Sequence, residues 1–83
     1  MEEEHISVTL HQRDVLTLLA QRNRVSIGEL ASLLDVSYVA VIKVVNRLEQ
    51  KQLVERVVDE WDRRRVFVSL TPAGWRILNE RFE

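Results

Sequence analysis

Hydrophobic and polar positions recur along the chain with two different periods. Up to residue 52, apolar side chains recur every three or four positions, the period of a helix buried on one face. This pattern predicts three helices, over residues 9–22, 26–34 and 37–51. The positions expected to face the core are Val15, Leu16, Leu18, Leu19, Leu30, Leu33, Leu34, Val41, Val44, Val45 and Leu48.

Capping residues mark where these helices begin. Gln12 follows Thr9 at the spacing of a capping box, and Glu29 follows Ser26 at the same spacing. Ser37 fits the N-cap of the third helix. Because this third helix is rich in β-branched residues, its intrinsic helix propensity is low, and packing must hold it.

Beyond residue 52 the apolar period changes to two. Residues 54–58 and 66–70 alternate as strands do, and the charged segment between them predicts the tip of a β-hairpin. Thr71 and Pro72 then predict the N-cap and first position of a last helix, over residues 71–82. The apolar side of that helix is formed by Trp75, Ile77, Leu78 and Phe82.

The order of elements predicts the fold class. Two helices joined by a tight turn, the second of them longer, favour a helix-turn-helix, and a hairpin directly after it adds a wing. We therefore expect an α+β winged helix-turn-helix: three helices, a two-stranded β-hairpin wing over residues 54–70 and a C-terminal helix, in one domain over residues 1–83. A short strand near Val25 is expected to pair with the wing, and residues 1–8 fit a short strand or an extended arm.

Composition excludes several classes of protein. A chain of 83 residues makes one small domain, and the absence of Cys excludes disulfides and thiolate metal sites. No apolar run approaches the length of a transmembrane helix, and the acidic start is unlike a signal peptide, so a cytoplasmic protein is expected. Because no catalytic triad, phosphate loop or metal-ligand cluster is visible, we expect a non-enzyme without cofactor or metal.

Charge is unevenly distributed along the chain. The net charge is −1, but residues 37–76 hold eight basic and five acidic residues, a local +3, whereas residues 1–36 carry a local −3. Ten of the twelve basic residues are Arg, which suits planar hydrogen bonding to phosphates and base edges. The second half of the chain is therefore the candidate for contact with nucleic acid.

A series of short motifs resembles the MarR family of winged-helix transcription regulators. The motifs occur in the family's order and spacing between about residues 9 and 80, and the series is far more specific than any one of them. They are residues 29–37, Val41, residues 45–51, residues 53–56, Asp62-Arg63-Arg64 and residues 68–74.

The resemblance implies binding to double-stranded DNA. The helix over residues 37–51 would be the recognition helix in the major groove, and Arg64 at the wing tip would enter the minor groove, oriented by Asp62. The resemblance further implies that Arg63 and Arg65 contact phosphates. The full set of expected contact residues is Ser37, Tyr38, Val39, Ala40, Ile42, Lys43, Asn46, Arg47, Asp62, Arg63, Arg64 and Arg65.

Other interpretations of the same residues stay open. Val39, Ala40 and Ile42 offer only methyl contacts to DNA, and Val39 and Ile42 also fit packing against a partner or the wing. With Trp61 they would form the docking surface of a winged-helix protein-interaction module that binds no DNA. Trp61 itself fits stacking on a sugar, packing on the wing or contact with a partner, and the Asp62-Arg63-Arg64 tip fits a solvated turn with local ion pairs.

Three departures from the family pattern affect these expectations. Val39, Ala40 and Ile42 stand on the outward side of the recognition helix, where the family usually has small polar residues at several positions. Gln52 stands where the family has Gly, so either the turn differs or Gln52 adopts a positive φ at a cost of roughly 1 kcal/mol. The chain is also too short for the family's long dimerisation helices and effector pocket. It is a minimal member, an excised domain or a dimer built differently.

We expect a homodimer through the terminal segments and no small-molecule effector. The apolar candidates for the dimer contact are Ile6, Val8, Trp75, Leu78 and Phe82. For Trp75 and Phe82, however, packing in the core against the first helix is favoured over an interface.

Overall fold

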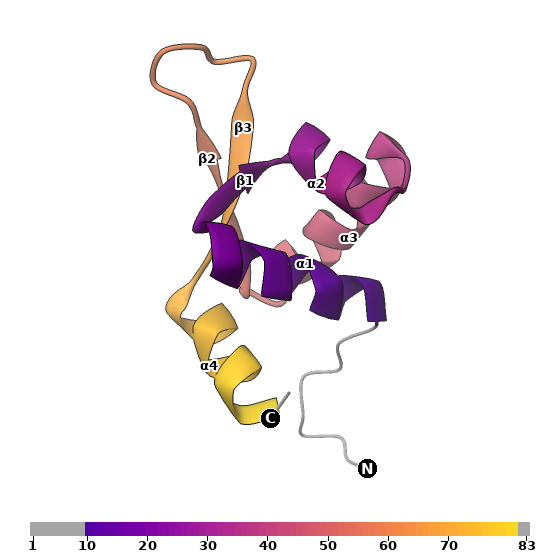
Figure 1. The fold of residues 1–83 in the computed structure, drawn as a ribbon. Helices are drawn as coiled ribbons and strands as arrows, with labels where there is room; N and C mark the ends of the chain where they lie inside the picture. The colour runs from indigo at the N-terminus through magenta and orange to yellow at the C-terminus, as the bar shows by residue number, and fades with distance from the viewer. Residues whose placement is uncertain (1–9, 82–83) are drawn as a thin grey trace.

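The computed structural model describes residues 10–81, which form four helices around a small antiparallel sheet (Figure 1). This arrangement confirms the predicted α+β winged helix-turn-helix. Predictions that concern residues 1–8, Thr9 and Phe82 lie outside the described residues. The elements are α1 (Leu10–Arg22), β1 (Arg24–Ser26), α2 (Ile27–Leu34), α3 (Tyr38–Gln50), β2 (Val54–Val58), β3 (Val66–Leu70) and α4 (Pro72–Arg81).

The helix-turn-helix is built from local hydrogen bonds. Ser26 Oγ accepts from the backbone N–H of Glu29, and Glu29 Oε1 accepts from that of Ser26, both at 3.1 Å, so the predicted capping box is confirmed. At the start of α3, Ser37 Oγ accepts from Ala40 N–H at 3.0 Å. Asp35 adopts a left-handed conformation with φ 58°, which ends α2 and turns the chain toward α3.

Strand β3 is the centre of the three-stranded sheet. It pairs antiparallel with β2 along the hairpin, from Val54 opposite Leu70 to Val58 opposite Val66. On its other side it pairs with β1, where Val25 lies opposite Val68, so the expected strand near Val25 is confirmed. The segment between β2 and β3 projects beyond the helices at the top of Figure 1.

The core lies between the sheet and the four helices. Its buried residues come from every element except α4, whose Ile77 and Leu78 pack against it half-buried. Gln12 is the one polar side chain buried within the described residues, and it accepts a 2.8 Å hydrogen bond from Lys51 Nζ. The buried apolar residues are Val15, Leu16, Leu19, Val25, Ile27, Leu30, Val41, Val45, Leu48, Leu53, Val54, Val68 and Leu70.

Two of the positions expected in the core lie at the surface. Leu33 and Trp75 are each 44% exposed, so the prediction that they are buried is wrong. In α2 the apolar stripe runs through Ile27, Leu30 and Leu34, which leaves Leu33 at its edge. In α4 it is Ile77 and Leu78 that reach the core, which leaves Trp75 outside it. Leu18, Leu34 and Val44 are half-buried and pack against the core, as their apolar character predicts.

The turn after α3 joins this helix to the wing and to α4. Gln52 has φ 63°, so of the two alternatives left open at this position, the left-handed conformation is the one observed. Its N–H bonds to Glu49 O at 2.9 Å and Leu53 N–H bonds to Leu48 O at 3.0 Å, the two hydrogen bonds of a Schellman motif. Thr71 donates to Gln52 O at 2.7 Å and accepts from Gly74 N–H at 3.1 Å, so its predicted capping role is confirmed.

Candidate nucleic-acid interface

Helix α3 exposes the polar residues expected to face DNA. Lys43, Asn46 and Arg47 are all exposed, because the buried side of the helix is occupied by Val41, Val45 and Leu48. At the start of the helix Tyr38 is 55% and Val39 61% exposed. Val39, Lys43, Asn46 and Arg47 recur at the spacing of one helix face, so they lie on the same side of α3.

Three of the expected contact residues of α3 and its N-cap are less accessible to DNA than the others. Ile42 is half-buried and packs against the core, and Ala40 is half-buried as well. Ser37 uses its hydroxyl oxygen as the N-cap, although the hydroxyl hydrogen can still be donated. Ile42 packs inward, so the apolar docking surface expected of a protein-interaction module loses one of its three residues and keeps Val39 and Trp61.

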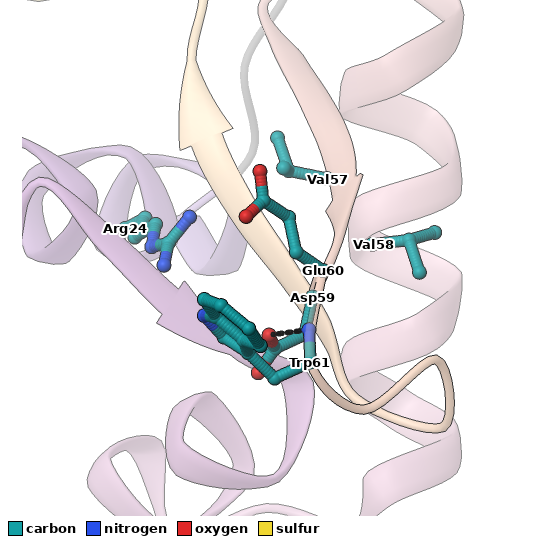
Figure 2. A pocket seen from close by; sticks show the side chains of 6 residues that line it. All are labelled: Arg24, Val57, Val58, Asp59, Glu60 and Trp61. Atoms are coloured by element: carbon teal, nitrogen blue, oxygen red, sulfur yellow. Dashed lines mark hydrogen bonds between the residues drawn. The ribbon is translucent and has the colours of Figure 1, made fainter.

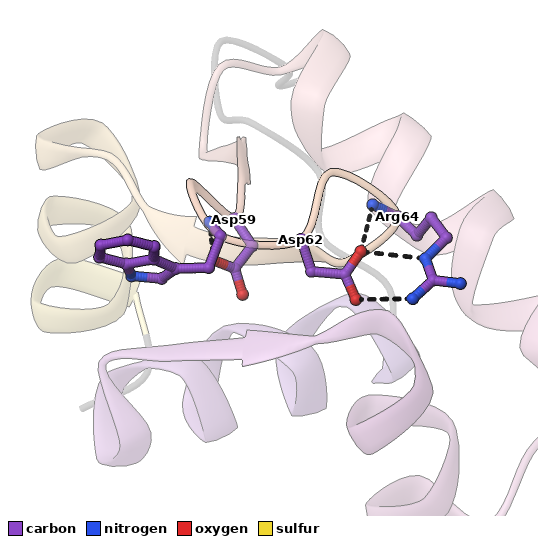
Figure 3. A network of polar contacts seen from close by, with 4 residues as sticks. Asp59, Asp62 and Arg64 are labelled. Carbon is purple, nitrogen blue, oxygen red and sulfur yellow. Dashed lines mark hydrogen bonds and ion pairs between the residues drawn. The ribbon is translucent and has the colours of Figure 1, made fainter.

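The wing tip holds Arg64 in a fixed orientation. Asp62 accepts from the Arg64 backbone N–H at 3.0 Å, from its Nε at 3.0 Å and from its Nη2 at 3.2 Å (Figure 3). Arg64 donates the two side-chain bonds as a planar fork, the geometry in which Arg pairs best with a carboxylate. These hydrogen bonds, those of the side chain first, lower the pKa of the Asp62 carboxyl, so Asp62 stays ionised at neutral pH.

Arg64 nonetheless stays open to solvent. Its side chain is 90% exposed, whereas that of its partner Asp62 is 34% exposed. The hairpin tip is closed beneath it by backbone hydrogen bonds from Asp59 to Arg65 at 3.0 Å and from Arg65 to Asp62 at 2.9 Å. An exposed guanidinium on a closed, protruding tip is well suited to enter a groove.

Two further arginines stack on the same aromatic ring. Arg65 lies over the ring of Phe67 at 5.2 Å from its centroid, and Arg24 of β1 lies over it at 4.4 Å. The sequence indicated Arg65 but not Arg24, which belongs to the acidic first part of the chain. Only the pairing of β1 with β3 brings Arg24 beside the wing.

A shallow cleft connects the start of α3 with the wing. It has a volume of about 190 Å³ and lies between Tyr38, the first turn of α2, and the Arg64–Val66 side of the hairpin. Residues predicted separately on the helix and on the wing are therefore brought together around one opening. Its lining is Ser26, Ile27, Gly28, Tyr38, Arg64, Arg65 and Val66.

Trp61 lies on the other side of the hairpin tip. It is 89% exposed, so the alternative that it packs back on the wing is wrong. It lines a second opening of about 280 Å³ together with Arg24, Val57 and Val58 (Figure 2). In that view its indole ring points to the side where Arg24 lies, while Val58 points the other way.

Arg56 belongs to the motif at residues 53–56, but the sequence indicated no contact role for it. It lies on β2, and its guanidinium donates from Nη2 to Asn46 Oδ1 on α3. Its Nε also lies 3.2 Å from Glu49 Oε1, one helical turn further along. The wing and the recognition helix are thus joined by one side chain, a contact that depends on the tertiary structure and has no signature in the sequence.

The described part of the chain offers neither a metal site nor a membrane span. Between residues 10 and 81, no three His, Asp or Glu side chains that the structure describes gather in a way that could hold a metal ion. No helix within that range is long and apolar enough to cross a membrane.

Comparison with known proteins identifies the fold family. Residues 8–74 match the family described as winged helix DNA-binding domain. The chain belongs to this family. The match covers the helix-turn-helix, the wing and the start of α4, so it includes all twelve expected contact residues.

Curated relatives of this winged-helix chain are named as transcription regulators. A putative transcriptional regulatory protein for the hcr operon of Thauera aromatica is 38% identical over 64 residues, which are 77% of this chain and 39% of the relative. The HTH-type transcriptional repressor MdtR of Bacillus subtilis is 37% identical over 71 residues, 86% of this chain and 46% of the relative. The chain therefore spans less than half the length of these relatives.

Solved structures confirm the resemblance to the MarR family. A mutant MarR from E. coli in complex with operator DNA superposes with a TM-score of 0.85 and 31% identity, over 89% of this chain and 53% of that one. The adhesin competence repressor AdcR of Streptococcus pyogenes superposes with a TM-score of 0.86 and 28% identity, over 96% and 58% respectively. These likenesses support DNA binding in transcription control over a protein-interaction module.

Proposed function

We propose that the chain regulates transcription by placing α3 in the major groove of double-stranded DNA and Arg64 in the adjacent minor groove. The observation that carries the proposal is the exposed Arg64, held by Asp62 on a hairpin tip that shares a cleft with the start of α3. A narrow minor groove has an enhanced negative potential, which attracts a protruding guanidinium. The protein is a binding protein in this proposal, without catalytic activity, and acts in the cytoplasm.

The cleft explains how the two grooves are contacted at once. One sugar–phosphate strand separates a major groove from the neighbouring minor groove, so it must pass between the recognition helix and the wing. Tyr38, Arg64 and Arg65 line the cleft at this place and supply donors suited to phosphate oxygens. Lys43 and Arg47 remain on the exposed face of α3 for base edges or phosphates.

A salt-dependent titration tests DNA binding itself. Fluorescence anisotropy with random and genomic DNA fragments should show binding at about 50 mM salt, where phosphate contacts are strongest. Since neutralised phosphates release counterions, the affinity should fall linearly on a log–log plot as salt rises. Absence of binding at low salt, or binding that ignores salt, would contradict the proposal.

We further propose that two copies bind a pseudo-palindromic site. One copy makes few contacts, and two copies related by two-fold symmetry match two half-sites about one helical turn apart. Of the terminal residues expected in the dimer contact, Trp75 and Leu78 lie in the described part: Trp75 is 44% exposed, and half-buried Leu78 packs against the core. Sedimentation with and without DNA should give two chains per site, and one chain per site at saturation would refute the dimer.

A further inference from the structure

A single guanidinium braces the wing against the recognition helix. Arg56 on β2 donates to Asn46 Oδ1 and pairs with Glu49 at 3.2 Å. Asn46 and Glu49 are three residues apart, so they lie on the same side of α3 and can share one partner. The planar fork of Arg can serve both acceptors at once, whereas the single ammonium of Lys serves them less well.

The brace decides which end of the Asn46 amide is left for a ligand. An Arg side chain has donors and no acceptor, so the amide atom that faces Arg56 must be the carbonyl oxygen. The amide therefore cannot flip while this contact holds. Asn46 is exposed, and none of the side chains in residues 12–79 accepts from its Nδ2, so its two N–H donors remain available to a ligand.

We propose that Arg56 is a positioning residue that makes Asn46 act mainly as a donor to base edges. An unrestrained Asn recognises adenine with both ends of its amide, donating to N7 and accepting from N6. Arg56 already occupies one of the two lone pairs of the Asn46 carbonyl oxygen, and its positive charge opposes the approach of a second donor such as adenine N6, so donation from Nδ2 is favoured. The base it fits best is then guanine, whose major-groove edge carries two acceptors, O6 and N7. This inference rests on the proposed position of α3 in the major groove.

The charges around Arg56 favour positioning over direct contact with DNA. Its charge is opposed by Glu49, and its side chain is 32% exposed, against 90% for Arg64. Arg64 also has an acidic partner, but it extends into solvent at the wing tip. Arg56 lies on the strand and directs its donors at α3 instead.

Selection of binding sites from a random DNA library tests this inference. The wild type should enrich guanine over adenine at one position of each half-site. In Arg56→Met the freed carbonyl of Asn46 should shift this preference toward adenine by roughly tenfold, the discrimination expected of a good Asn–adenine pair. Glu49→Gln is the matched control, because it removes the ion pair and leaves the hydrogen bond to Asn46, so its preference should match the wild type.

A double variant separates positioning from a general effect on stability. In an Asn46→Ala background, Arg56→Met should change the base preference no further, since the side chain it acts through is absent. Should Arg56→Met fail to fold, Asn46→Asp carries the test. Asp keeps the contact with Arg56 but has no N–H to donate, so the guanine preference should be lost while the protein stays folded.

Three results would overturn the inference. Uniformly weaker binding of Arg56→Met to all sequences, with a shallower salt dependence, would make Arg56 a phosphate contact. A wild type that selects adenine at the position sensitive to Asn46, or an Asn46→Asp variant that keeps guanine, would contradict the role of Asn46 as a donor. A wild type that enriches no sequence would instead refute the proposed function, so the two failures are distinguishable.

Discussion

At the scale of single residues, the backbone conformation of Gln52 has a measurable cost. Its φ of 63° is the left-handed region, which Gly enters freely and a residue with a Cβ enters at a cost of about 1–2 kcal/mol. Asn23 and Asp35 also have positive φ, at 76° and 58°, but Asn and Asp tolerate this region better. Gln52 is therefore the residue of the three whose replacement by Gly should gain most.

Gln52→Gly should raise the free energy of unfolding by about 1 kcal/mol, after the greater entropy of Gly in the unfolded chain is subtracted. For a domain of this size that corresponds to a rise of roughly 4–8 °C in Tm, measurable by circular dichroism. Gln52→Ala is the control and should bring no gain, because Ala keeps the Cβ. If the Gly variant melts at no higher temperature than the Ala variant, the backbone of Gln52 is not strained.

The ion pair at the wing tip predicts a pKa that depends on Arg64. Hydrogen bonds from the Arg64 side chain and then its backbone, with the nearby charge of Arg65, lower the pKa of Asp62 below its ordinary value. A carboxyl whose folded pKa is lowered keeps its contact above its unfolded pKa and loses it as the pH falls through the folded pKa. The fixed orientation of Arg64 should therefore persist at neutral pH and disappear only in acid.

An NMR titration of the Asp62 carboxyl carbon measures this effect. Arg64→Ala should move the titration midpoint upward toward the ordinary Asp value, because the largest cause of the shift is removed. Arg76→Ala, an exposed Arg of α4 away from the wing, should leave it in place. A midpoint that is the same in all three proteins would show that the pair does not form in solution.

At the scale of elements, the junction between α4 and the turn after α3 is the tightest contact involving a glycine. A Cβ on Gly74 would lie 2.2 Å from Leu53 O and 2.9 Å from Leu70 Cδ2. That carbonyl already accepts from Thr71 N–H at 3.1 Å, so the backbone cannot simply move away. Gly at this position lets α4 begin directly against the end of β3.

Gly74→Ala should destabilise the protein by about 1–3 kcal/mol, the usual range for inserting a methyl group into a packed site. Gly28→Ala is a matched control, since a Cβ there meets nothing within 4 Å and the residue lies in α2. That substitution should be neutral or stabilise by roughly 0.5–1 kcal/mol, because Ala is the better helix former. Chemical denaturation measures the free energy of unfolding of both variants. An equal loss of stability in the two would contradict the close approach of Gly74 to Leu53 O.

The elements were predictable from sequence where their signals are local. The caps at Ser26 and Ser37 and the alternation of β2 and β3 depend on residues near one another, so spacing alone revealed them. The exposure of Leu33 was not predictable in this way. It depends on which side of a short helix meets the core, and that is set by the packing of α2 against α3 and the sheet.

The same distinction between local signals and tertiary contacts applies to the candidate site. The motif series placed Asp62 and Arg64 correctly at a hairpin tip, because their spacing within the turn is part of the motif. The stacking of Arg24 on Phe67 and the contact of Arg56 with Asn46 join elements far apart along the chain. Such contacts depend on the strand register and on the packing of helix against wing, which a periodic pattern does not encode.

At the scale of the whole molecule, the acidic and basic parts of the sequence take different places in the fold. The net charge of −1 includes a local −3 over residues 1–36 and a local +3 over residues 37–76, the part of the chain that contains α3 and the wing. Helix α4 packs against α1 at the end of the molecule away from the wing tip (Figure 1). The proposed DNA contact and the proposed dimer contact at Trp75 therefore lie on separate parts of the domain. Both contacts can form at the same time.

The central claim is that Arg64 enters a DNA groove from the wing, and one titration tests it most directly. Anisotropy should be measured with the same DNA fragment for the wild type, Arg64→Ala and the control Arg76→Ala, which removes an equal charge from α4. We expect Arg64→Ala to weaken binding by about 1–3 kcal/mol and Arg76→Ala to change it little. An Arg64→Ala variant that binds as tightly as the wild type would contradict the account.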